Sequence, residues 1–151
     1  EYHLKQGGVR RRDERVLFDQ TLRSALMTRE DREQNITLSG HVLDDLSFTA
    51  QLSADLLADP TLQTPDTVLS YQIVDARRIE EHQYRVLGSE RISTGAGELE
   101  ALKLERVRDV DSERSTVLWL APENQFTLAR LTQIENGSTM ELTLQQISWT
   151  E

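Results

Sequence analysis

The sequence predicts a mainly β protein of the α+β class, in which antiparallel hairpins surround a single amphipathic helix. Asn136-Gly137, the strongest short signal for a hairpin turn, separates two β-rich runs near the end of the chain. Only one stretch, residues 43–57, carries apolar residues at a wide helical spacing. The length of 151 residues is typical of a single domain, so we expect residues 1–151 to form one domain.

The first forty residues carry the signals of a hairpin and a short strand. Residues 2–6 and 15–22 lie on either side of a Gly7-Gly8 turn, and residues 35–38 add a strand. The basic cluster Arg10 to Arg12 is followed at once by two acidic residues, which indicates a solvated hairpin. A domain that opens directly on a strand indicates a fragment whose earlier strands are missing.

The helix is expected over residues 43–57. Asp44 and Asp45 favour its first turn through the helix dipole, and Pro60 marks its end. Such a wide apolar stripe should pack on a sheet. The stripe consists of Leu43, Leu46, Ala50, Ala54 and Leu57, widened by Phe48, Leu52 and Leu56.

Four strands should follow the helix, and in the first of them Leu69, Tyr71 and Ile73 alternate with other residues. Glycines in Thr94-Gly95-Ala96-Gly97 allow the turn between the second and third strands, and Ala121-Pro122 closes the fourth. The expected strands are residues 67–74, 83–92, 99–107 and 114–120.

The last hairpin joins residues 126–135 to residues 138–149. Met140, Leu142 and Leu144 alternate with polar residues, so this face should pack and the other should be solvated. The parity changes after Gln145-Gln146, which predicts a bulge or a strand end there.

Composition excludes several classes of function. The chain has no cysteine, which excludes disulfides, iron–sulfur sites and thiol nucleophiles. Its net charge of -9 argues against nucleic-acid binding, which depends on clustered Lys and Arg. The longest apolar run, residues 117–121, is too short for a transmembrane segment.

No pattern of catalytic or cofactor-binding residues is recognisable. The three histidines are dispersed, and no G-x-S-x-G or complete dinucleotide loop occurs. The adjacent pairs Asp44-Asp45 and Glu80-Glu81 diverge on a helix or strand, so we interpret them as solvated. We therefore expect no enzyme activity, no cofactor and no metal. Trp119 and Trp149 are interpreted as core residues, with ligand contact as the alternative.

Several short motifs in one order resemble a bacterial envelope family known as domain of unknown function 3108. The similarity touches most of the chain, but this sequence has Leu128 and the Thr94 turn where the family usually has a proline and Pro-Ala-Gly. The matching motifs are Tyr84-Arg-Val-Leu-Gly88-Ser-Glu, Thr94-Gly-Ala-Gly97, Leu102-Lys-Leu-Glu-Arg106-Val-Arg, Trp119-Leu-Ala-Pro122-Glu and Glu141-Leu-Thr-Leu144.

The resemblance implies a periplasmic protein with a signal peptide in its precursor, and a curved antiparallel sheet or partial β-barrel packed around the helix. It implies no established activity. Our main hypothesis is a non-enzymatic module that binds an envelope protein or an apolar ligand, with Tyr71, Tyr84, Trp119 and Trp149 as its possible contact surface. The alternatives are a lipid or lipoprotein carrier, its cavity lined by residues such as Leu69, Tyr71, Tyr84 and Leu104, and a hydrolase with two carboxylates in a cleft.

Overall fold

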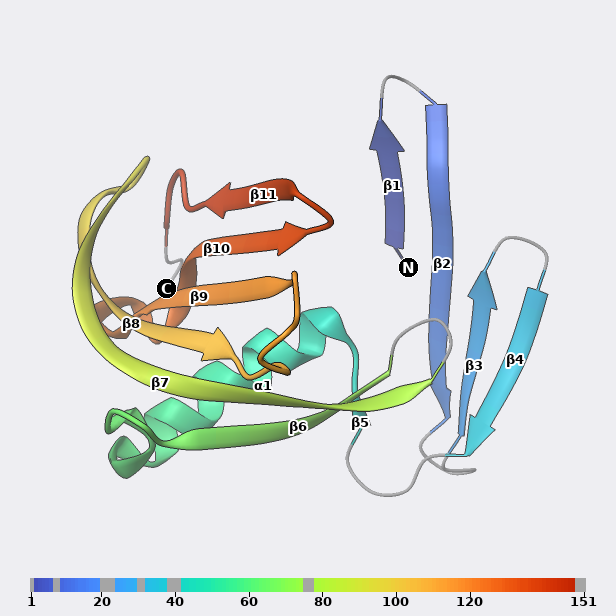
Figure 1. Ribbon diagram of the computed structural model, residues 1–151, viewed down its shortest axis with the longest axis horizontal. Helices are drawn as coiled ribbons and strands as arrows, with labels where there is room; N and C mark the ends of the chain where they lie inside the picture. Colours follow the sequence, from blue (N-terminus) through green and yellow to red (C-terminus); the bar gives the residue numbers. More distant parts are fainter. Residues whose placement is uncertain are drawn as a thin grey trace. The chain divides into compact units, whose positions relative to one another are not determined.

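The computed structural model describes residues 2–6, 9–19, 24–29, 32–37, 42–74 and 78–148, which form two compact units. The first unit contains Glu1–Phe48 and Tyr71–Glu81, and the second contains Thr49–Ser70 and His82–Glu151. The elements, shown in Figure 1, are β1 (Tyr2–Gln6), β2 (Val9–Asp19), β3 (Ser24–Arg29), β4 (Arg32–Thr37), β5 (Val42–Leu43), α1 (Asp45–Ala58), η1 (Pro60–Gln63), β6 (Val68–Val74), β7 (Ile79–Thr94), β8 (Gly97–Arg106), β9 (Ser115–Ala121), η2 (Pro122–Asn124), β10 (Thr127–Glu135) and β11 (Ser138–Thr143).

In the first unit, four antiparallel strands form a sheet in the order β1-β2-β3-β4. The predicted first hairpin is present, but β2 begins at Val9 and is much longer than the expected run of residues 15–22. The strand predicted at residues 35–38 corresponds to the end of β4, whereas β3 was not predicted. The sequence of β3, SALMTR, mixes strand and helix formers in six residues, too few to show a periodicity.

The other sheet has seven strands in the order β11-β10-β9-β8-β7-β6-β5, and it is curved and not closed (Figure 1). This architecture, with one α-helix, confirms the predicted fold class. One pair differs from the antiparallel expectation, because β5 lies parallel to β6 with Val42 opposite Gln72. Leu43 was predicted to start the helix but belongs to β5. A helix between two strands is the usual crossover for a parallel pair.

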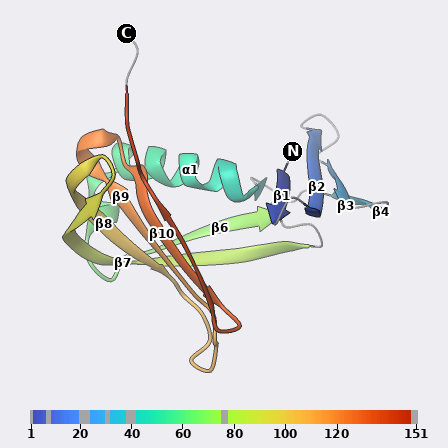
Figure 2. The ribbon, with the colours of Figure 1, turned by 90° about the horizontal axis from the view of Figure 1, so that it is seen from above.

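The helix α1 begins after a capping interaction and runs along the concave side of the sheet (Figure 2). Ser47 donates its backbone N–H to Asp44 Oδ1 at 2.7 Å, and Asp44 donates its own to Ser47 Oγ at 2.9 Å. Phe48, Leu52 and Leu56 are buried at a spacing of four residues. The predicted stripe was therefore wrong in its centre: Ala50, Ala54 and Leu57 are exposed, and the residues thought to widen the stripe make its core.

Within the second unit, the sheet has an apolar core on each face. On one face Leu104, Leu118 and Leu120 are buried. Neighbouring residues in the same strands point to the other face, because side chains alternate along a strand. The second face carries a smaller cluster formed by Ile92, Ala101, Trp119, Ala121 and Ala129.

A bulge in β7 allows that strand to serve both faces. The pairing with β8 shifts register between Val86 and Gly88, where Gly88 has a φ of 115°. One inserted residue reverses the parity of a strand, so Val86 packs with the first core and Ile92 with the second. Gly88 therefore acts as a bend residue in β7.

The predicted hairpin at Asn136-Gly137 joins β10 to β11. Both turn residues have positive φ, 50° and 73°, as a type I′ turn requires. The strand β11 ends at Thr143, before Gln145-Gln146, so it is shorter than the expected run of residues 138–149.

Candidate functional site

One edge of the seven-stranded sheet is formed by β11. It pairs with β10 from Glu135 opposite Ser138 to Arg130 opposite Thr143, and no described residue pairs with its other side. Along an antiparallel pair, every second residue directs its N–H and C=O groups away from its partner strand. The edge therefore offers an unused ladder of donors and acceptors.

An apolar row runs across the sheet and ends at this edge. Successive partners in the register are Val86, Leu104, Leu118, Leu131 and Leu142, one from each of the strands β7 to β11. The first three are buried, Leu131 is half-buried and Leu142 is 54% exposed. The row thus emerges from the core into solvent as it approaches β11.

The exposed end of this row corrects a prediction. Met140 and Leu142 were expected to lie on a packed face, yet they are 46% and 54% exposed. Their parity is the packed one, because Leu142 lies opposite Leu131 and in the same row as Leu118. Burial along the row therefore stops before β11, and these two side chains are exposed. Met140 and Leu142 therefore form an exposed apolar surface on β11.

A small hollow of about 190 Å³ adjoins this surface. The backbone N–H of Leu144 donates to the Ala129 carbonyl at 2.8 Å, which holds the chain beside β10 just after β11 ends. The hollow, here named the leucine hollow, is lined by Leu128, Ala129, Arg130, Leu142, Thr143 and Leu144.

Trp119 lies in a group of polar contacts on the other face of the sheet, here named the tryptophan clamp: Trp119, Glu90, Lys103 and Arg130. The indole Nε1 donates to Glu90 Oε1 at 2.6 Å, and Lys103 Nζ lies 3.2 Å from the same oxygen. Lys103 Nζ and Arg130 Cζ lie 5.2 and 5.7 Å from the centre of the Trp119 ring. These are cation–π distances, and they hold the ring between neighbouring strands.

The contacts of the clamp change the pKa of Glu90. The hydrogen bond from the Trp119 indole, followed by the one from Lys103, lowers the pKa of the Glu90 carboxyl below its ordinary value. Both donors stabilise the charged carboxylate. This carboxylate is therefore held ionised as a structural acceptor, a state unsuited to donating a proton near neutral pH.

The four residues named in the sequence as a possible contact surface are not gathered in one site. Tyr71 is buried with its ring 5.2 Å from that of Phe48, in an edge-to-face arrangement. Tyr84 is buried on β7, and Trp119 is buried in the clamp. Trp149 lies outside the described residues. The exposed apolar residues of β11 and the arginines described next were not among the predicted site residues.

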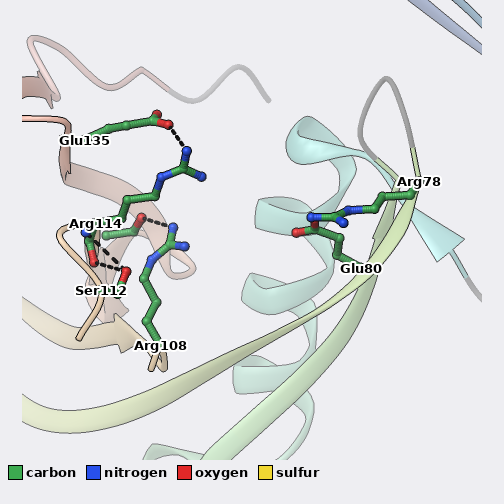
Figure 3. Close-up of polar contacts among 7 residues, drawn as sticks. Arg78, Glu80, Arg108, Ser112, Arg114 and Glu135 are labelled. Atoms are coloured by element: carbon green, nitrogen blue, oxygen red, sulfur yellow. Dashed lines mark hydrogen bonds and ion pairs between the residues drawn. The ribbon is translucent and has the colours of Figure 1, made fainter. Parts of the chain in front are cut away.

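A larger hollow of about 340 Å³ lies where β8 ends and the chain loops towards β9. Arg108 donates from Nη2 to Thr116 Oγ1 at 3.3 Å, while its Nε is buried without a partner among the described residues. Arg114 pairs instead with Glu135 at 2.8 Å (Figure 3). We name this the arginine hollow; its lining residues are Gln83, Arg106, Val107, Arg108, Asp109 and Ser112.

The signal for the arginine hollow was present in the sequence but was weak. Arg106 and Arg108 have the same parity and flank Val107 at the end of a strand, just before the acidic loop of residues 109–113. Side chains two residues apart in extended chain lie on one side. In an acidic protein, two such arginines beside a loop are a better indicator of a polar site than isolated aromatic residues.

Within the described ranges, no group of three or more His, Asp or Glu side chains is arranged to hold a metal ion. None of the described helices has both the length and the apolar character needed to cross a bilayer.

Comparison with known proteins gives one match. The family described as "Protein of unknown function (DUF3108)" matches residues 2–145. No curated protein and no solved structure shows significant similarity to the chain. The match covers most of the chain and includes β7 to β11, the motifs that suggested the same family in the sequence. The chain therefore belongs to the DUF3108 family.

Proposed function

We propose that this protein is a non-enzymatic binding module of the bacterial envelope that captures an extended segment of a partner protein along β11. The observation that carries the proposal is the coincidence of two features on one strand. The backbone edge of β11 is unpaired within the described chain, and its side chains Met140 and Leu142 are exposed. The envelope location rests on the family resemblance.

The chemistry of this edge favours a peptide segment over a lipid. A row of unpaired N–H and C=O groups is satisfied by the backbone of an added strand, which a lipid acyl chain lacks. Met140 and Leu142 are two residues apart, so both side chains lie on one face of the strand. The segment that fits would present apolar residues at alternate positions, and could place one of them in the leucine hollow.

The carrier hypothesis receives less support from the interior of the protein. Its proposed lining residues, Leu69, Tyr71, Tyr84 and Leu104, are all buried. The helix fills the concave side with Leu52 and Leu56, which are fully buried. The leucine hollow, at about 190 Å³, is below the range of roughly 300–1,000 Å³ that is usual for small-molecule sites.

The hydrolase hypothesis also fits the hollows poorly. A glycosidase needs two carboxylates in one cleft. The arginine hollow is lined by a single carboxylate, that of Asp109, together with two guanidinium groups. Its charge is suited to binding an anion rather than to protonating a leaving group and supplying a carboxylate nucleophile.

The test compares two leucines of similar exposure. Leu142 is 54% exposed on β11, and Leu57 is 51% exposed on α1. Each is replaced by Glu, and a photo-crosslinking amino acid is introduced at Glu141, whose side chain is exposed. The proteins are incubated with a periplasmic extract from a family-bearing bacterium, and cross-linked peptides are mapped by mass spectrometry.

We expect one or a few partner segments to cross-link next to Glu141, with alternating apolar residues. Leu142→Glu should abolish these cross-links, because a buried unpaired carboxylate opposes docking, while Leu57→Glu should retain them. Equal yields from the two variants would refute docking at β11. Cross-links to lipid alone would favour the carrier instead, and cross-links to a second copy would identify self-association.

A further inference from the structure

The arginine hollow is a second site with its own chemistry, separate from the β11 edge. It lies at the end of β8, and all of its lining residues come from β7, β8 and the following loop. The backbone N–H of Val107 donates to the Gln83 carbonyl at 2.8 Å, which extends the β7–β8 pairing to the floor of the hollow. The segment that carries Arg106 and Arg108 is therefore fixed relative to Gln83 on β7.

The loop that closes the hollow is held by local hydrogen bonds. Ser112 donates its backbone N–H to the Asp109 carbonyl at 2.9 Å, and the backbone N–H of Arg114 donates to Ser112 Oγ at 3.2 Å. These contacts, some of which are drawn in Figure 3, form a turn that positions the Ser112 hydroxyl beside the arginines. The site is thus built by backbone structure and does not depend on long mobile side chains alone.

Arg108 has hydrogen-bond donors without acceptors, which favours a ligand in this hollow. Its guanidinium has five N–H donors, and among the described residues it donates a hydrogen bond to one hydroxyl, Thr116 Oγ1, at 3.3 Å. No described carboxylate lies within ion-pair distance of it, although Arg114 and Glu135 nearby form such a pair. The negative charge of Glu135 acts on Arg108 only from beyond ion-pair distance, so it offsets the cost of desolvating this half-buried guanidinium only in part.

The surrounding charges increase that cost. Burial, followed by the positive charges of Arg106 and Arg114, lowers the pKa of Arg108 from its ordinary value. Within the hollow the one opposing charge is Asp109, which is exposed. An anion bound between Arg106 and Arg108 would reduce this repulsion and supply acceptors for the unused N–H groups of Arg108.

We propose that the arginine hollow binds a phosphoryl group. The planar guanidinium of arginine pairs with phosphate through two parallel hydrogen bonds, and the amide of Gln83 and the hydroxyl of Ser112 add neutral donors. The Ser112 hydroxyl donates to the Arg114 carbonyl at a long 3.5 Å, and an anion would offer it a stronger acceptor. A tetrahedral phosphate offers more acceptor oxygens to such a set than a carboxylate does. The volume of about 340 Å³ leaves room for a small organic part, so a soluble phosphate ester and a phospholipid headgroup share the required chemistry.

The experiment follows the backbone amides of Val107, Asp109 and Ser112 by NMR while inorganic phosphate, glycerol 3-phosphate or succinate is added at constant ionic strength. A fourth sample contains vesicles of phosphatidylglycerol in phosphatidylcholine, with pure phosphatidylcholine vesicles as reference. The wild-type protein is compared with Arg108→Met and Arg108→Lys. Arg91→Met is the matched control, because Arg91 is an exposed arginine on β7 outside the hollow.

We expect saturable shifts with phosphate, at a Kd on the order of 1 mM. Arg108→Met should weaken binding about tenfold or more, Arg108→Lys should weaken it less, and Arg91→Met should leave it within about twofold of the wild type. A stronger response to glycerol 3-phosphate would indicate a soluble ester, and binding to phosphatidylglycerol vesicles alone would indicate a headgroup.

Three outcomes would overturn the proposal. These are no saturation with any phosphate compound up to about 20 mM, well beyond a millimolar Kd, tighter binding of succinate than of phosphate, or equal weakening by Arg108→Met and Arg91→Met. Circular dichroism checks that each variant is folded. If Arg108→Met does not fold, Arg108→Lys provides the same comparison with the charge retained.

Discussion

Arg108 and Arg130 are both half-buried, and each has a buried Nε without a partner among the described residues. Arg130 lies in the tryptophan clamp, where it donates to the Ser93 carbonyl at 2.6 Å and approaches the face of Trp119. Arg108 lies in the arginine hollow with a single longer contact to a hydroxyl. Arg130 is therefore held by contacts within the sheet, whereas Arg108 keeps N–H donors without acceptors. Charge and burial alone do not separate the two roles; their acceptors do.

In the tryptophan clamp, substitution of Trp119 should have the largest effect on stability. We expect Trp119→Ala to lower the free energy of unfolding by about 3–4 kcal/mol, because a large buried ring is lost from the Ile92 and Ala101 cluster. Trp119→Phe keeps most of the ring and should cost less, since it loses mainly the hydrogen bond to Glu90. Urea denaturation followed by circular dichroism measures both values. A loss below about 1 kcal/mol for Trp119→Ala, the central value for ordinary point mutations, would show that this cluster is not a core.

Arg130 should be the next most sensitive residue. Arg130→Met keeps an apolar stem on β10 but removes the hydrogen bond to Ser93 and the cation beside Trp119, so we expect a loss of about 1–2 kcal/mol. The same urea denaturation measures it, with Arg91→Met as a control for the loss of an exposed positive charge. If Arg130→Met costs no more than Arg91→Met, the clamp contributes nothing through this arginine.

Glu90 makes the clamp dependent on pH. Because its pKa is lowered by the hydrogen bonds from Trp119 and Lys103, its charged form stabilises the folded state at pH values above its unfolded value and this contribution is lost as pH falls through the folded value. The side chain is 45% exposed, so solvent screening limits the effect to about 0.5 kcal/mol.

Glu90→Gln retains an acceptor for the indole but cannot ionise. We therefore expect the wild type to be more stable than Glu90→Gln near pH 7, and the difference to shrink as pH is lowered from about 5 to 3, across the usual range of a glutamate. Thermal unfolding at a series of pH values measures the difference. A difference that stays constant with pH would show that the charge of Glu90 is not what Trp119 and Lys103 recognise.

The different roles of Arg108 and Arg130 could not be predicted from the sequence, although most strands of the seven-stranded sheet could. Asn136-Gly137 is a local signal, because positive φ angles favour particular residues, and the hairpin turn lies where it was predicted. The buried face of α1 was misplaced by part of a turn, since apolar residues surround most of the helix and tertiary contacts select Leu52 and Leu56.

The candidate sites depended even more on the three-dimensional arrangement. The partners of Trp119 come from β7, β8 and β10, so no sequence window contains the clamp. Whether an arginine has an acceptor likewise depends on residues from another strand. Arg130 meets a carbonyl from residue 93, whereas Arg108 meets a hydroxyl eight residues away on β9.

The smallest expected effect on stability is the most informative for the comparison. Arg108→Met should change the free energy of unfolding by less than about 0.5 kcal/mol, because Arg108 makes one long hydrogen bond and is repelled by Arg106 and Arg114. The same substitution at Arg130 should cost several times more. Urea denaturation in phosphate-free buffer measures both variants, and added phosphate should then stabilise the wild type but not Arg108→Met, since ligands that bind the folded state alone raise its stability. A loss at Arg108 as large as that at Arg130 would mean that both arginines are structural.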